Sequence, residues 1–151
     1  MIYKDEPCPH CGRFTNRGVS IDAVIIKDGK VLLIQRGVEP NKGFWGTPGG
    51  YVGWDESAEE AVIREVKEET ALSVSNPQFV GIFSDPNRHP QQTINLVYLV
   101  QDIQGELKKG DDATDAKWIE LENLPNEMAL DHKHNIELAQ KLTIVESTDN
   151  I

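Results

Sequence analysis

Carboxylates are concentrated between residues 50 and 72, and some of them are spaced to share one face of a helix. The acidic side chains of this stretch are Asp55, Glu56, Glu59, Glu60, Glu65, Glu68 and Glu69. At about 100° per residue, Glu65, Glu68 and Glu69 fall within an arc of about 100° on a helix. Like charges at these spacings destabilise a helix by about 0.2–0.5 kcal/mol per pair. A hard divalent cation would reverse that effect, so this face predicts a metal site, with a solvent-exposed acidic helix as the alternative.

A glycine-rich segment precedes the acidic stretch and could approach a phosphate or a metal closely. Residues 44–54 are predicted to be mostly loop, because they contain Gly46, Gly49, Gly50, Gly53 and Pro48. Glycine has no Cβ, so its N–H and C=O groups can reach a phosphate or a metal ion. Mg²⁺ is typically shared between a few carboxylates and substrate phosphates. The two segments together favour a phosphate substrate bound with the help of a divalent cation.

The spacing of these residues resembles the Nudix box, the signature of the Nudix hydrolase family. The matching positions are Gly50, Glu56, Arg64, Glu65, Val66, Glu68, Glu69 and Leu72, and the lead-in at 45–50 is also similar to the family's entry to the box. The departure is Ala71, where the family normally has a glycine that ends the helix in a left-handed turn. A residue other than glycine costs on the order of 1 kcal/mol there, which affects the local loop more than the chemistry.

The resemblance implies an α/β fold, an α/β/α sandwich with a mixed β-sheet. It also implies an enzyme, a pyrophosphohydrolase that uses a divalent metal to split the pyrophosphate bond of a nucleoside diphosphate linked to another group X. The expected ligands of Mg²⁺ or Mn²⁺ are Glu65, Glu68, Glu69 and the carbonyl of Gly50. In the family, Arg64 and Glu56 mainly brace the loop and the helix by ion pairing.

The general base stays open between the box and a later loop. Some relatives of the family add an acid from a loop that precedes a late strand. Here Asp112 is the candidate, with Asp111 and Asp115 as neighbours that could substitute for it. An acidic turn in water is the alternative explanation of this loop. Without Asp112, Glu68 or Glu69 would be the base.

The segment at 84–90 bears on the substrate, because it is similar to a segment of ADP-ribose pyrophosphatases. His89 and Gln91 stand where those enzymes usually have Asp and Arg, and the serine and proline spacing also resembles NADH pyrophosphatases. Arg88 could pair with a phosphate. The candidates for stacking on a base are Phe44, Trp45 and Trp54, for which packing is the alternative. We expect ADP-ribose, or a related nucleoside diphosphate sugar or dinucleotide, rather than a triphosphate.

The pattern of apolar residues predicts the elements that position these side chains. A hairpin is predicted at 19–27 and 31–36, because Asp28 and Gly29 suit a type I′ turn. A capping box of Ser57 and Glu60 begins a helix over 58–70. Further strands are predicted at 72–84, 93–101 and 116–120, and a closing helix at 132–142. The chain is thus divided into an irregular arm at 1–18, one Nudix domain at 19–144 and a tail at 145–151.

The arm contains both cysteines, Cys8 and Cys11, in a knuckle that resembles half of a zinc ribbon. Two thiolates at this spacing can take adjacent corners of a tetrahedral zinc site. A full site would need His89, His132 or His134, or two cysteines from each of two subunits. A degenerate knuckle without zinc is the alternative.

Length and charge limit the classes of protein to consider. The 151 residues correspond to one domain, and the net charge of −10 disfavours binding to duplex nucleic acid. The apolar runs are far shorter than a membrane span, and no export signal is visible, so a cytoplasmic protein is expected. The expected partner is a small nucleotide, and a homodimer is open because family members of this size are often dimers. The alternative functions are a nucleotide-sensing or partner-binding Nudix module without turnover, and a zinc-knuckle nucleic-acid adaptor.

Overall fold

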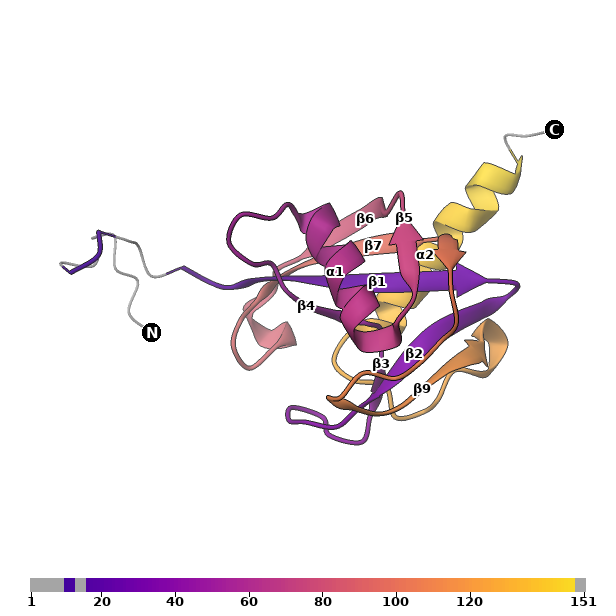
Figure 1. The fold of residues 1–151 in the computed structure, drawn as a ribbon, viewed down its shortest axis with the longest axis horizontal. Coiled ribbons are helices and arrows are strands. Elements are labelled where there is room, and N and C mark those ends of the chain that lie inside the picture. Colours follow the sequence, from indigo (N-terminus) through magenta and orange to yellow (C-terminus); the bar gives the residue numbers. More distant parts are fainter. Residues whose placement is uncertain (1–9, 13–15, 149–151) are drawn as a thin grey trace.

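The structure is a computed structural model that describes residues 10–12 and 16–148 (Figure 1). Its centre is strand β1 (Val19–Lys27), which pairs in parallel with β7 (Ile94–Val100) and antiparallel with β2 (Lys30–Arg36). The remaining strands of this sheet are β3 (Trp45–Gly46) and β9 (Ala113–Glu120) on β2, β4 (Gly49–Tyr51) on β1, and β6 (Gln78–Phe83) on β7. These pairs are antiparallel, so the sheet is mixed, as predicted.

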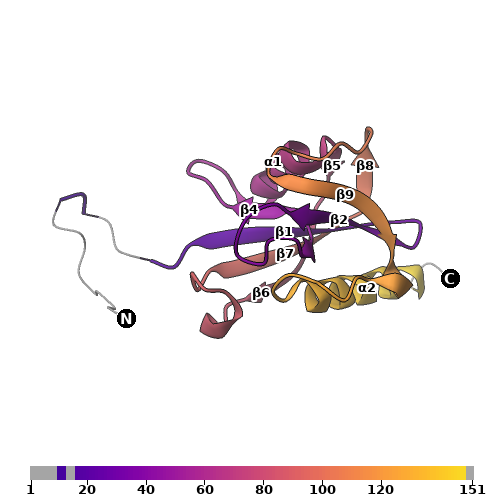
Figure 2. The same ribbon diagram turned by 90° about the horizontal axis from the view of Figure 1, so that it is seen from below.

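The two helices cover opposite faces of this sheet. In Figure 2, α1 (Ala58–Thr70) lies above the strands and α2 (His132–Thr148) lies below them. Val62 of α1 packs in one core cluster with Ala23 and Ile25, whereas Ile136 of α2 packs in the other with Val24. Successive residues of β1 therefore point to opposite helices, as the period of a strand requires. The predicted α/β/α sandwich is confirmed.

Helix α1 begins and ends as its local sequence dictates. The Ser57 hydroxyl accepts a hydrogen bond from the Glu60 backbone N–H at 3.1 Å, and the Glu60 carboxylate accepts one from the Ser57 N–H at 2.7 Å. This is the predicted capping box. At the other end, Ala71 adopts a left-handed conformation with φ of 62°, and its N–H bonds to the carbonyl of Lys67. Alanine therefore takes the turn that glycine normally makes.

The strand predicted at 72–84 is wrong in its extent, because the chain turns in the middle of it. Asn76 has φ of 52° and Pro77 follows, so the strand stops at Ser75 and β6 starts at Gln78. The first part, β5 (Ser73–Ser75), pairs with β8 (Asp102–Gln104) in a separate small sheet. This small sheet fixes the position of the residues that directly follow α1.

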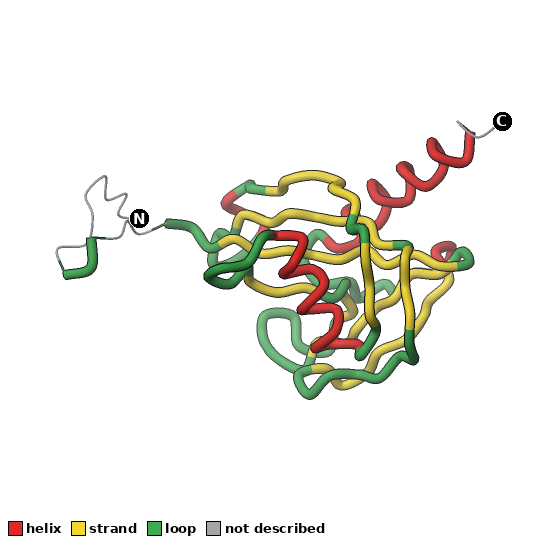
Figure 3. The backbone as a smooth tube through the Cα atoms, turned by 45° about the horizontal axis from the view of Figure 1, so that its top comes forward, coloured by secondary structure: helices red, strands yellow, loops and turns green. Residues whose placement is uncertain are grey.

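Other boundaries also differ from the sequence prediction. The glycine-rich segment 44–54 contains the short strands β3 and β4, which pair with β2 and β1. Strand β9 begins at Ala113, before the predicted residue 116. Helix α2 continues past residue 142 to Thr148, because residues 143–148 contain neither glycine nor proline. Its C-terminal part projects beyond the sheet (Figure 3). Residues 145–148, expected in the tail, are thus helical.

The described residues of the arm give no support for the zinc site. Cys8 lies outside the described residues, and Cys11 is a free, exposed thiol. In the part of the chain that the structure describes, no three His, Cys, Asp or Glu side chains are grouped so that they could hold a metal as they stand. Neither of the two α-helices in the described residues has the length and apolar character that crossing a membrane requires.

Candidate active site

A cleft of about 690 Å³ brings together segments that are far apart in the sequence. On one side it is lined by Glu65, Glu68 and Glu69 of α1, by Gly49 and Gly50 of β4, and by the loop 110–113. On the other side it is lined by Asp22 of β1, Arg36 at the end of β2, residues Arg88, His89, Thr93 and Asn95, and His132 at the start of α2. The cations Arg36 and Arg88 lie on the second side together with the carboxylate of Asp22, and Arg36 borders the loop 110–113 because it pairs with Ala113.

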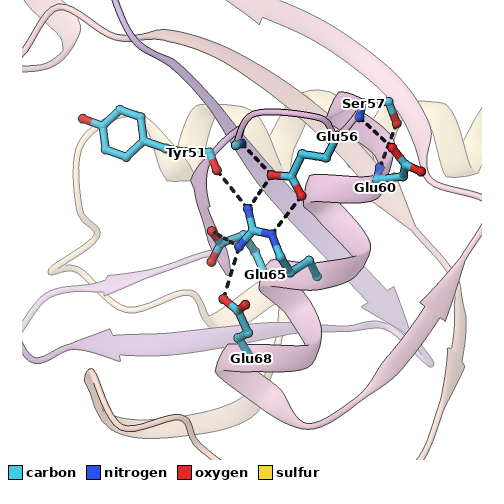
Figure 4. Close-up of polar contacts among 8 residues, drawn as sticks. Tyr51, Glu56, Ser57, Glu60, Glu65 and Glu68 are labelled. Atoms are coloured by element: carbon cyan, nitrogen blue, oxygen red, sulfur yellow. Dashed lines mark hydrogen bonds and ion pairs between the residues drawn. The ribbon is translucent and has the colours of Figure 1, made fainter.

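Arg64 of α1 forms ion pairs with three carboxylates at this site (Figure 4). Its Nε and Nη2 donate to both oxygens of Glu56, at 2.9 and 2.6 Å. Its Nη1 donates to Glu65 at 2.8 Å and to Glu68 at 3.2 Å, and Nη2 also reaches the carbonyl of Tyr51 at 3.0 Å. One guanidinium therefore ties the loop before α1 to three carboxylates.

The ionisation of these groups follows from the same contacts. Hydrogen bonds from Arg64 and from the Gly53 N–H hold the pKa of Glu56 at about 2. The hydrogen bonds with Glu56 and Glu65 raise the pKa of Arg64. Burial raises the pKa of Glu65 despite its contact with Arg64. Glu56 and Arg64 are thus a permanent ion pair at neutral pH.

Glu69 faces away from Arg64 and lacks such a partner. Its Oε2 accepts a hydrogen bond of 2.8 Å from the Gly49 N–H. None of the ion pairs among the described residues includes it. Burial raises the pKa of Glu69 to about 8, and the charges of Glu65 and Asp22 add to this effect. The site therefore contains a buried carboxylate that has no ion-pair partner among the described residues and whose charge is offset only in part by the Gly49 N–H and by Arg36.

Two glycines let the main chain approach these carboxylates. A Cβ on Gly50 would lie 2.3 Å from Oε1 of Glu65, and a Cβ on Gly49 would lie 2.3 Å from the carbonyl oxygen of Ile21. Both distances are too short for any other residue. Carboxylate and carbonyl oxygens are the ligands that Mg²⁺ and Mn²⁺ prefer. The donor set thus fits a hard divalent cation. To bind it, Glu65 and Glu68 would give up their hydrogen bonds with Arg64.

The loop at 110–113 completes the acidic side. The Gly110 N–H donates to the carbonyl oxygen of Glu69 at 2.7 Å, and a Cβ on Gly110 would lie 2.8 Å from the carbonyl oxygen of Glu68. Asp111 and Asp112 follow, are exposed and line the cleft. The structure therefore places Asp112 on the same side of the cleft as the carboxylates of α1.

Arg88 lies in the cleft wall but is already paired. Its Nε and Nη2 donate to both oxygens of Asp131, at 2.8 and 3.2 Å, and its Nη1 donates to the hydroxyl and carbonyl of Thr93. The side chain is 8% exposed. Most of its donors are therefore occupied by the protein itself.

Arg36 is the cation with free donors on this side of the cleft. Its Nε donates to the carbonyl of Pro40 at 2.7 Å, and its Nη atoms make no hydrogen bond or ion pair with the described residues. Burial, together with the charges of Arg88 and Arg36, lowers the pKa of His89, so this imidazole is neutral at pH 7. An anion in the cleft would therefore meet Arg36.

Comparison with known proteins identifies the family of this chain. The profile of the NUDIX domain matches residues 16–139, which is most of the chain. The chain belongs to the Nudix family. The predicted Nudix pyrophosphohydrolase is thereby confirmed. The predicted box supplies Gly50, Glu65, Glu68 and Glu69 to the acidic side of the cleft.

Relatives of known name share the Nudix fold and much of the sequence. An ADP-ribose pyrophosphatase of Methanocaldococcus jannaschii is 44% identical over 121 residues, which are 80% of this chain and 71% of that protein. The NUDIX domain of Shewanella oneidensis NrtR, in complex with ADP ribose, is 28% identical with a TM-score of 0.77, over 86% of this chain and 90% of the other. A bifunctional NMN adenylyltransferase/ADP ribose pyrophosphatase of Francisella tularensis, in complex with AMP and a Mn ion, is 29% identical with a TM-score of 0.72. This last match covers 88% of this chain and 42% of that longer one.

Aromatic residues expected to stack on a base do not line the Nudix cleft. Trp45 packs in the core cluster on the α2 side, and the ammonium of Lys117 lies 4.5 Å from its ring centroid. Trp54 is 80% exposed. Phe44 is half-buried outside the lining of the cleft.

Sequence reasoning missed Arg36 and Asp22, which the structure brings into the Nudix cleft. Both lie on strands, where a single charged residue in an apolar run was the available signal. Asp22 interrupts the apolar pattern of β1, and Arg36 ends β2. Only the pairing of β1 with β4 and the course of β2 place them near the Nudix box.

Proposed function

We propose that this Nudix hydrolase cleaves the pyrophosphate bond of ADP-ribose or a closely related nucleoside diphosphate sugar. The observation that carries the proposal is that one cleft contains both the box carboxylates and the guanidinium of Arg36, whose Nη atoms have no partner among the described residues. The similarity to the Methanocaldococcus ADP-ribose pyrophosphatase supports the choice of ADP-ribose. Water and ADP-ribose would give AMP and ribose 5-phosphate.

The metal of this reaction would be held by the acidic side of the cleft. We assign Mg²⁺ or Mn²⁺ to Glu65, Glu68, Glu69 and the carbonyl of Gly50. When bound, such a metal neutralises charge on the pyrophosphate oxygens and lowers the pKa of a water molecule. The Mn ion of the Francisella complex supports a divalent metal.

The side chains of the protein would bind the substrate and move the proton. Arg36 offers two Nη donors to a phosphate of the substrate, a pairing that suits a guanidinium. Arg64 would brace the loop before α1 through its two hydrogen bonds to Glu56. The proton of the attacking water would pass to a carboxylate oxygen of Glu68 or Asp112, both of which open into the cleft.

A hydrolysis screen tests the proposal directly. The purified chain is incubated with Mg²⁺ or Mn²⁺ and with ADP-ribose, NADH, nucleoside diphosphate sugars, diadenosine polyphosphates or nucleoside triphosphates. We expect ADP-ribose to be cleaved fastest, with AMP as a product. Faster cleavage of triphosphates would refute the substrate assignment.

A nucleotide-binding module without turnover is the second candidate function. It is favoured by the ADP-ribose complex of the Shewanella NUDIX domain, and by the engagement of Glu65 and Glu68 with Arg64. In that case ADP-ribose would raise the melting temperature, but neither metal would give product.

A further inference from the structure

The floor of the cleft on the α2 side contains a polar group that the hydrolytic machinery does not use. We infer that Asp22, Asn95 and His132 form a subsite that binds the hydroxyls of a sugar attached directly to the pyrophosphate. The inference rests on the proposed function and names which part of the substrate this side of the cleft recognises.

Asp22 supplies an acceptor that is buried but open to the cleft. Its side chain is on the α2 side of β1, because Ala23 and Ile25 face α1 and strand residues alternate. The residue is 8% exposed and lines the cleft. Its Oδ2 accepts a hydrogen bond of 2.7 Å from Asn95, whereas its Oδ1 has no partner among the described residues. Among the described residues, the side-chain atoms that have neither solvent contact nor a hydrogen-bond partner are those of Asn135. Oδ1 of Asp22 is not one of them, so it keeps contact with solvent. A buried carboxylate oxygen with this exposure needs a donor from a ligand or from water.

Asn95, itself hydrogen-bonded to Ser20, holds the carboxylate of Asp22 in a fixed orientation. Asn95 is 1% exposed, and its Oδ1 accepts a hydrogen bond of 2.9 Å from the Ser20 hydroxyl. Its Nδ2 is therefore the atom that faces Asp22, and the second N–H group of Nδ2 has no hydrogen-bond partner among the described residues. Asp22 and Asn95 together present an acceptor and a donor side by side.

His132 adds a second donor whose tautomer is set by the backbone. Its Nδ1 lies 2.9 Å from the Thr47 backbone nitrogen, and a backbone N–H can only donate. Nδ1 is thus the acceptor, and the ring N–H is on Nε2. His132 lines the cleft, and its Nε2 has no hydrogen-bond partner among the described residues. A ligand oxygen can therefore accept from Nε2.

The position of Asp22 indicates which part of a nucleotide it meets. A Cβ on Gly49 would lie 2.6 Å from Oδ1 of Asp22, and the N–H of the same glycine binds Glu69. The subsite is thus next to the carboxylates that would hold the metal. In ADP-ribose the sugars are bonded directly to the pyrophosphate, whereas the adenine is one ribose further away. A group that binds at Asp22 beside the pyrophosphate is therefore a sugar rather than the adenine.

The chemistry of the subsite favours hydroxyls over a phosphate. A hydroxyl both donates and accepts, so a pair of hydroxyls can donate to Asp22 and accept from Asn95 or His132. A phosphate would be repelled by the carboxylate of Asp22. Tyr51 supplies the phenyl ring among the described residues that line the cleft, and this side chain is half exposed and points away from the Arg64 cluster (Figure 4). Apart from Tyr51, no phenylalanine, tyrosine or tryptophan among the described residues lines the cleft.

Steady-state kinetics of the full chain test the subsite. Asp22→Asn keeps the shape and a partner for Asn95 but removes the charge. We expect it to raise the KM for ADP-ribose at least ten-fold more than it lowers kcat. His132→Asn, which keeps an acceptor for Thr47 and removes Nε2, should act in the same direction. The matched control is Asp28→Asn, the same change in the exposed turn between β1 and β2, which should leave KM as in the wild type.

Analogues of ADP-ribose that lack the 2- and 3-hydroxyls of one ribose or of the other identify the sugar. The wild type should bind one of these analogues more weakly than it binds ADP-ribose. Asp22→Asn should bind that analogue no more weakly than it binds ADP-ribose. The inference is overturned if both variants melt like the wild type and bind ADP-ribose with unchanged KM, or if Asp22→Asn weakens every analogue equally. Lack of ADP-ribose hydrolysis by the wild type overturns the proposed function, and with it this subsite.

Discussion

Glu68 is the box carboxylate that is least held by the protein. Its contact with Arg64 is 3.2 Å long, and its side chain is 57% exposed in the open cleft. We predict that Glu68→Gln lowers turnover about 100-fold or more, because the amide removes a charged ligand and a proton acceptor. The melting temperature should stay close to that of the wild type. Glu137→Gln, on the exposed surface of α2, is the control for the chemical change and should keep full turnover.

The two arginines of the cleft should respond in opposite ways to the same substitution. Arg36→Gln is expected to raise the KM for ADP-ribose about ten-fold or more, with little change in stability, because the Nη donors are free. Arg88→Gln should mainly lower stability, because it leaves Asp131 without its partner. Kinetics and thermal melting of both variants check this. A large KM effect confined to Arg88→Gln would show that the phosphate lies at Arg88 instead.

The Arg88–Asp131 pair also predicts a pH dependence of stability. Burial alone would raise the pKa of Asp131, but the hydrogen bonds and charge of Arg88 outweigh it and lower that pKa. An acid with a lowered pKa contributes stability above its unfolded pKa, near 3.9, and loses it as the pH falls through the folded value. Asp131→Asn should therefore cost about 3 kcal/mol of unfolding free energy at pH 7, and less as the pH falls below about 4.

Urea denaturation at pH 7 and at pH 3 measures this difference. Asp115→Asn is the control, since Asp115 lies 3.7 Å from Lys117 in an exposed pair and should contribute less than about 1 kcal/mol. A difference for Asp131→Asn that grows towards acid pH would contradict the assigned sign.

At the scale of elements, the end of α1 carries a measurable strain. Ala71 has φ of 62°, a conformation that costs a side chain with a Cβ about 1 kcal/mol. Ala71→Gly should therefore raise the free energy of unfolding by about 0.5–1 kcal/mol without changing KM. Ala58→Gly, in the first turn of the same helix, should lower it by a similar amount. Equal signs for the two variants in urea denaturation would show that Ala71 is not strained.

Elements whose signals are local were predictable from the sequence. The capping box of Ser57 and Glu60 and the turn at Asp28 and Gly29 act within a few residues, and both are present. The break after Ser75 was missed, although Asn76 and Pro77 are themselves a turn signal, because the flanking residues favour a strand. The pairing of β5 with β8 depends on a chain segment that comes much later, so no local pattern could reveal it.

At the scale of the whole molecule, the two sides of the cleft differ in how far the sequence predicts them. The acidic side comes from one contiguous motif, and its spacing alone pointed to the Nudix family. The other side depends on contacts such as that of Arg88 with Asp131, 43 positions apart, and that of Asn95 with Asp22, 73 positions apart. Such contacts exist only after β1 and β7 pair and α2 packs beneath them. The residues to which we assign substrate recognition were therefore less predictable than those to which we assign the metal.

Because the cleft joins both layers of the sandwich, ligand binding should stabilise the entire fold. Its lining comes from α1, β1, β2, β4 and the start of α2. A ligand that binds only the folded state at 100 times its Kd adds about 2.7 kcal/mol. For a chain of this length that corresponds to a rise of about 5–10 °C in melting temperature. We predict this rise for Glu68→Gln with ADP-ribose and Mg²⁺, since that variant hardly consumes the ligand. Differential scanning fluorimetry should show one transition that moves as a whole. A rise confined to one of two transitions, or none at millimolar ADP-ribose, would show that the ligand does not bind between the layers.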